Sequence, residues 1–194
     1  MLQAIKYNLS HLTDFSGRDA RPTFWYYVLF LVIVQFALSF AVSIPLAGAM
    51  VGDAVVASQQ GIGEQAVQAR MMERVGGMMR ASMWLSVFTT LLMLGLIVAA
   101  FTRRLHDSGK PGWIAAIIAV IQIFVVILTV TSIDEMVSVA ARLQEGESSM
   151  AAMQGRFLAQ SLLAWVPTIL VLVFGVWPST KGENRYGPQP QPVR

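Results

Sequence analysis

The chain has 194 residues, of which 55% belong to the set AVILMFWYC and only 13% are Asp, Glu, Lys or Arg. Its mean hydropathy of +0.59 excludes an ordinary water-soluble domain of this size and favours an integral membrane protein. The lack of cysteine excludes disulfides, thiolate metal sites and cysteine nucleophiles. The net charge of +3 does not indicate a nucleic-acid partner, because in so apolar a chain the positions of the charges matter more than their sum.

Residues 1–23 are polar and lack the central apolar block of a cleavable signal peptide, so we expect the first membrane span to remain in the mature protein. Apolar residues recur in this segment at steps of three and four, which predicts an amphipathic helix lying in the membrane interface. The alternative is a frayed tail with chance spacing. The apolar stripe consists of Leu2, Ile5, Leu9, Leu12 and Phe15.

Four stretches without a charged residue follow, and each reaches the roughly 20 residues that a helix needs to cross about 30 Å of hydrocarbon. We therefore predict an all-α integral membrane protein, with four transmembrane helices in an antiparallel bundle that forms a single domain, residues 1–194. The outer connections are rich in helix-forming residues, which predicts helical extensions of the spans. The spans are 24–50, 81–102, 111–133 and 157–178, with outer loops 51–80 and 134–156, a loop 103–110 and a tail 179–194.

The basic residues indicate which way the chain crosses the membrane. Nine of the 14 Lys and Arg lie in the amino-terminal segment, the loop 103–110 and the tail, against five in the two longer outer loops. With the acidic residues included, the first group carries a net charge of +5 and the second −2. Because Lys and Arg accumulate on the cytoplasmic side, both termini are predicted to be cytoplasmic.

Two glutamines lie inside the predicted spans. Gln35 and Gln122 are each about eleven residues from the cytoplasmic end of their span, which places both roughly 16 Å deep at the rise of an α-helix. Since lipid offers no hydrogen bonds, we expect them to contact each other or a shared neighbour. A structural hydrogen bond is favoured over a substrate site, because no ionisable group lies at this depth.

Three polar motifs fall on the predicted cytoplasmic side. They are Gly17-Arg18-Asp19-Ala20-Arg21 with Phe24-Trp25, Arg103-Arg104-Leu105-His106-Asp107 with Gly112-Trp113, and Asn184-Arg185-Tyr186-Gly187. In these motifs, taken in this order, the sequence resembles the bacterial inner-membrane family called domain of unknown function 805. The resemblance implies a location in the bacterial inner membrane, and it implies no activity, because none is established for the family.

Short connections make successive spans neighbours, so the three motifs are expected to form one polar cluster near the lipid headgroups. Arginine supplies planar donors suited to phosphate or carboxylate, which makes the cluster a candidate site for an anionic headgroup or a small phosphorylated ligand. The alternative is that its ion pairs only lock the helix ends and satisfy the rule for basic cytoplasmic residues. The candidate residues are Arg18, Arg21, Arg103, Arg104, His106, Asp107, Asn184, Arg185 and Tyr186.

The favoured function is a non-enzymatic membrane protein with a structural or regulatory role, whose partners are the lipid bilayer and anionic lipid. A homo-oligomer remains open. One alternative is a membrane enzyme that acts on a phosphorylated lipid through His106 and Asp107, although adjacent helical residues point about 100° apart. A small oligomeric transporter is the other alternative, disfavoured by spans without ionisable residues. We expect no cofactor or metal, because His11 is the only other histidine.

Overall fold

The computed structural model describes residues 1–59, 64–142 and 150–191. Over these residues it contains five α-helices and no strand: α1 (Leu2–Ser10), α2 (Arg21–Gln59), α3 (Glu64–Asp107), α4 (Trp113–Arg142) and α5 (Met150–Val176). Four of the helices, α2 to α5, are long and apolar enough to cross a membrane. The predictions of an all-helical chain and of four long apolar segments suited to crossing a membrane are therefore confirmed over the described residues.

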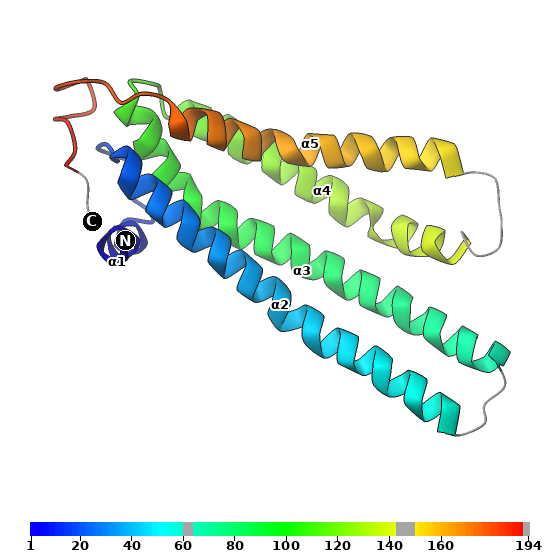
Figure 1. Ribbon diagram of the computed structural model, residues 1–194. Helices are drawn as coiled ribbons and strands as arrows, with labels where there is room; N and C mark the ends of the chain where they lie inside the picture. Colours follow the sequence, from blue (N-terminus) through cyan, green and yellow to red (C-terminus); the bar gives the residue numbers. More distant parts are fainter. Residues whose placement is uncertain (60–63, 143–149, 192–194) are drawn as a thin grey trace.

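The long helices converge at one end of the molecule. Figure 1 shows both chain termini, the short helix α1 and the α3–α4 connection at this end, which we call the terminal end. From there α2 and α5 diverge toward the opposite end (Figure 1), while α3 and α4 stay in contact, as the ion pair between Arg80 and Asp134 at 2.9 Å shows. The amino-terminal segment, the last turn of α5 and the tail therefore meet at the terminal end.

Two helices are much longer than a bilayer requires. At 1.5 Å per residue, the 39 residues of α2 and the 44 of α3 span roughly 58 and 66 Å, against about 30 Å of hydrocarbon. Residues 51–59, expected as part of an outer loop, instead continue α2, because Ala and Gln there favour a helix and no proline interrupts it. The predicted extension on α4 continues to Arg142, and residues 143–149 lie outside the described residues.

An apolar core of buried side chains lies at the terminal end. Phe24 and Tyr27 of α2 pack there against Phe101 and Leu105 of α3, and all four side chains are almost fully buried. The Tyr27 hydroxyl donates to the Leu96 carbonyl at 3.0 Å, which satisfies it within the apolar layer. This core fixes α2 against α3 directly below the polar motifs.

Helix α5 reaches the core through a glycine. A Cβ at Gly175 would lie 2.9 Å from Phe24 and 3.0 Å from Trp25, so only a residue without a side chain lets α5 approach α2 this closely. Further along the helices large apolar side chains face outward, with Phe36 61% exposed and Leu162 69%. An apolar exterior of this kind is expected of helices that face lipid.

Candidate functional site

The site begins where α3 ends. Helix α3 closes with two backbone bonds typical of a glycine-terminated helix, from Lys110 to the Leu105 carbonyl at 2.9 Å and from Gly109 to the His106 carbonyl at 3.0 Å. Gly109 has a φ of +71°, a conformation that a side chain disfavours. The sharp stop holds the last turn of α3 (residues 103–107) inside the protein, where all five residues are buried.

Arg103 ties α3 to the amino-terminal segment. Its Nε donates to Asp19 at 3.1 Å and its Nη2 to the Asn8 side-chain oxygen at 2.7 Å. Its Nη1 donates to the carbonyls of His11 at 2.8 Å and Asp14 at 2.5 Å, directly after α1. Because the last carbonyls of a helix lack intrahelical partners, this guanidinium caps the carboxyl end of α1.

Arg104, the next residue, caps a different helix. Its Nε donates to the Gly175 carbonyl at 3.0 Å and its Nη2 to the Trp177 carbonyl, both at the carboxyl end of α5. Its Nη1 donates to Asp107 at 2.5 Å, one turn along α3. The side chain is fully buried, so these protein acceptors take the place of water.

Arg18 binds the tail. Its Nη1 donates to the carbonyls of Gly182 at 2.8 Å and Gly187 at 3.0 Å, and its Nη2 donates to the Thr180 carbonyl at 2.7 Å. Nη2 also forms an ion pair with Asp107 at 3.0 Å, and both side chains are only 1% exposed. The three buried arginines together hold α1, α3, α5 and the tail as one unit, which we call the arginine clasp: Arg18, Arg103 and Arg104 with Asp19 and Asp107.

Asp107 is the centre of the clasp. One carboxylate oxygen accepts from Arg18, while the other accepts from Arg104 and from the Ser179 hydroxyl, each at 2.5 Å. Its carbonyl accepts from the Thr180 amide at 2.8 Å and the Thr180 hydroxyl at 2.9 Å, so the tail in turn caps α3. Sequence alone offered no signal for Ser179 and Thr180, because hydroxyl residues in a tail are common.

The charges of the clasp nearly balance once the helix ends are included. Three buried arginines face two buried aspartates, which leaves a formal excess of one positive charge. The carboxyl ends of α1 and α5 each carry about half a negative charge and point at Arg103 and Arg104. Two such ends supply roughly the missing negative charge, which explains why no further acid is needed. Glu183 in the tail is exposed and makes no ion pair with any described residue.

Burial has an electrostatic consequence at Asp19. Loss of water raises the pKa of the Asp19 carboxyl above its usual value, while Arg103 beside it acts in the opposite direction. The Asp19 amide also donates to the Arg103 carbonyl at 3.1 Å, so both main chain and side chain of this residue are held by α3.

The sequence pattern of the family described as Protein of unknown function (DUF805) matches residues 12–188, and so covers all three polar motifs. The chain belongs to the DUF805 family. No curated protein and no solved structure matches the chain. The family description names no activity, so the roles of residues in this DUF805 protein rest on its own geometry.

The tail motif of this DUF805 protein docks on His106. The Tyr186 ring stacks on the His106 ring with centroids 3.7 Å apart and planes at 7°. Asn184 donates to the His106 carbonyl at 3.0 Å and accepts from the Tyr186 amide at 2.9 Å, which closes a turn back to Gly187. The motif residues thus share one structural task, which is to seat the tail on the end of α3.

His106 and Asp107 do not face each other in the structure. The His106 ring nitrogen Nδ1 contacts the Gly17 carbonyl at 3.1 Å, whereas the Asp107 carboxylate is engaged by the clasp. A Cβ at Gly112 would lie 2.9 Å from the other ring nitrogen of His106, so the end of the α3–α4 connection covers that side. The ring is enclosed by main chain and Tyr186, and no described group of three or more His, Cys, Asp or Glu residues could hold a metal ion.

The remaining two candidates lie outside the buried core of the clasp. Arg21 is exposed and makes one long contact of 3.4 Å to the Trp177 carbonyl. Arg185 is exposed and lies over the Tyr186 ring, 4.7 Å from its centroid. Both guanidinium groups are therefore accessible at the surface of the terminal end.

Proposed function

We propose that this DUF805 protein is a non-enzymatic, multi-pass protein of the bacterial inner membrane with a structural or regulatory role, and that its terminal end is a preassembled basic platform facing the cytoplasm. The main support for the proposal is that every guanidinium nitrogen of the clasp already donates to a protein acceptor. Arg18 and Arg104 direct all three of their guanidinium nitrogens to protein acceptors, as Arg103 does, and none is left facing solvent. Such a network stabilises the terminal end and leaves no guanidinium nitrogen of the buried arginines without a protein partner.

The proposed topology is an antiparallel bundle with both termini inside the cell. It is supported by the nine basic residues in the segments at the terminal end, against five in the outer connections. Reporter fusions after Gly109 and at the carboxyl terminus should read as cytoplasmic, and a fusion after Gly63 as external. An external carboxyl terminus would overturn the topology.

Helix α1 is proposed to lie in the cytoplasmic membrane interface. Its inner face, with Ile5 and Asn8, is buried against the protein. On the helix, Leu2 is 79% exposed and Leu9 is 41% exposed. Phe15, which lies beyond the helix, is 47% exposed. The predicted apolar stripe is thus divided, because Ile5 packs against the protein while Leu2 and Leu9 are exposed, and these exposed residues support insertion among the headgroups.

Binding of anionic lipid is proposed for the exposed basic residues and not for the clasp. A headgroup would have to break buried ion pairs to reach Arg18, Arg103 or Arg104. Exposed basic side chains near a membrane surface each attract anionic lipid by about 1 kcal/mol. Those on the terminal end are Lys6, Arg21, Lys181 and Arg185.

A charge-matched pair of variants tests this lipid binding. The double variant Arg21→Gln/Arg185→Gln is compared with Arg74→Gln/Arg80→Gln, which removes two exposed basic residues from α3 far from the terminal end. Each protein is purified from vesicles of phosphatidylglycerol and phosphatidylcholine, and retained lipid is measured by native mass spectrometry. Retention of phosphatidylglycerol should fall about thirtyfold in the first variant only, since two contacts of about 1 kcal/mol are removed. Equal retention in both variants would refute the platform as a headgroup site.

A further inference from the structure

A cavity of about 520 Å³ lies among the four long helices, on the side of the apolar core that faces away from the polar motifs. Its wall comes from all four long helices and includes Val28, Ile97, Ile118 and Leu172, with Phe101 among the lining residues that also belong to the core. A volume of this size is within the range of about 300–1,000 Å³ found for small-molecule sites. None of the 24 lining residues is charged, so the wall favours an uncharged occupant.

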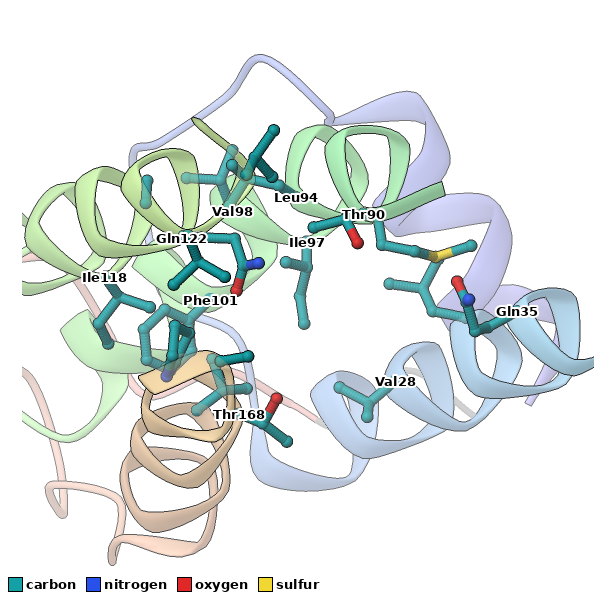
Figure 2. A pocket seen from close by; sticks show the side chains of 18 of the residues that line it. Val28, Gln35, Thr90, Leu94, Ile97, Val98, Phe101, Ile118, Gln122 and Thr168 are labelled. Atoms are coloured by element: carbon teal, nitrogen blue, oxygen red, sulfur yellow. The ribbon is translucent and has the colours of Figure 1, made fainter. Parts of the chain in front are cut away.

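Polar side chains interrupt the apolar wall at a few points. Figure 2 shows Gln122 of α4, Thr168 of α5 and Gln35 of α2 arranged around the same space, with Thr90 on the α3 wall. No hydrogen bond of any kind is made by the side chains of Gln35 and Gln122 with the described residues, and in particular none joins the two amides as the sequence led us to expect. Both nevertheless line one cavity, so they share a neighbourhood without sharing a bond.

Unpartnered amides are costly at this depth. An amide transferred from water to a medium without hydrogen bonds loses roughly 4–8 kcal/mol, and lipid tails cannot restore the bonds. Thr129, which also lines the cavity, differs from the two glutamines because its side chain has hydrogen-bond partners. Its hydroxyl donates to the Val125 carbonyl and accepts from Gln160. Gln35 and Gln122 therefore indicate an occupant that supplies hydrogen-bonding groups inside an otherwise apolar space.

The size of the cavity argues against a protein segment as occupant. One turn of an α-helix, about 5.4 Å long and 10 Å wide, already fills roughly 420 Å³, so the cavity holds little more than one turn of a helix from a second copy. Water alone is disfavoured as well, because 18 of the 24 lining residues have side chains without a polar group for hydrogen bonding. A slender hydrocarbon chain with a neutral polar group fits both the wall and the amides.

We propose that this cavity binds one uncharged amphiphile from the membrane, a hydrocarbon chain bearing a hydroxyl or carbonyl group that is held by Gln35 and Gln122. None of the exposed basic residues of the terminal end lines the cavity, so this proposal stands or falls independently of the lipid headgroup proposal. Because the wall belongs to membrane-spanning helices, the ligand can enter from the bilayer without crossing water.

Photolabelling tests the site with two probes of equal chain length, a diazirine-bearing hexadecanol and a diazirine-bearing hexadecane. Ala119 lines the cavity, whereas its neighbour Val120 is 65% exposed on the outer surface of α4. Ala119→Phe should therefore reduce labelling of the cavity wall by hexadecanol at least fivefold, while Val120→Phe changes it less than twofold. If Ala119→Phe does not fold, Ala164→Phe fills the cavity from α5, with exposed Leu162→Phe as its control.

The polar part of the proposal has its own readout. In the double variant Gln35→Leu/Gln122→Leu, labelling by hexadecanol should fall at least fivefold while labelling by hexadecane stays within twofold of the original. Two results would overturn the proposal. If cavity-filling and surface variants label alike, the probes only coat the outer helices. If the double glutamine variant treats both probes alike, the cavity is an unspecific space for hydrocarbon and not an amphiphile site.

Discussion

Arg103 and Arg104 are adjacent in the sequence, yet their guanidinium groups cap the carboxyl ends of two different helices, α1 and α5. Neighbouring residues on a helix point about 100° apart, so one turn of α3 reaches in two directions at once. The two consecutive arginines of α3 thereby connect the amino-terminal segment to the last helix, α5.

Removal of one arginine should release one side of the clasp only. In Arg103→Gln, Asp19 is left buried without its ion-pair partner, which should cost about 3 kcal/mol of unfolding free energy. Limited proteolysis should then cut first near residues 11–16, while in Arg104→Gln it should cut first after α5. The control is Arg80→Gln, whose pair with Asp134 is exposed and should contribute less than about 1 kcal/mol. Identical cleavage patterns in the two variants would contradict the claim that Arg103 holds the amino-terminal segment and Arg104 holds α5.

Gly175→Ala should destabilise the terminal end. The added methyl group would overlap Phe24, whose ring is fully buried and cannot swing aside, and overpacking of this kind typically costs about 1–3 kcal/mol. Gly95→Ala is the matched control, because nothing lies within 4 Å of its new Cβ and alanine favours a helix by roughly 0.5–1 kcal/mol. Unfolding in mixed micelles measures both. Equal effects of the two substitutions would show that α5 does not need its close approach to α2.

The Tyr186 ring should hold the tail through stacking and not through its hydroxyl. Tyr186→Ala removes the contact with His106, worth about 1 kcal/mol, so trypsin should cut at Lys181 and Arg185 about fivefold faster. Tyr186→Phe keeps the ring and should be cut at the original rate. Faster cleavage of the phenylalanine variant would instead assign the docking to the hydroxyl group.

Asp19 predicts an unusual dependence of stability on pH. Because burial raises its pKa in the folded protein, the folded state binds a proton more readily than the unfolded state does. The contribution of this carboxyl to stability is therefore greatest below its unfolded pKa, near 4, and falls as pH rises through the folded value. The melting temperature of the original protein minus that of Asp19→Asn should decrease from pH 4 to pH 7. An increase over the same range would mean that Arg103 outweighs burial.

Much of the fold could be predicted because membrane helices are specified locally. A span must be apolar over about 20 residues and must satisfy its backbone within the helix, so each of the four spans is visible in its own stretch of sequence. The helical extensions were visible for the same reason, through residues that favour helix, and the family resemblance could be read from three contiguous motifs. The exact helix ends were less visible, as residues 51–59 show.

The candidate site was harder to predict than the fold, because the sequence shows the hydrogen-bond donors of the site but not their acceptors. The sequence motifs placed Arg18, Arg103 and Arg104 in one cluster. The acceptors that complete the clasp are mostly main-chain carbonyls at helix ends, which every residue carries and no sequence pattern marks. The same limit applies to Gln35 and Gln122. Depth along a helix follows from counting residues. The rotation and spacing of the helices are set by packing over the whole bundle, and these decide that the two amides face a cavity instead of each other.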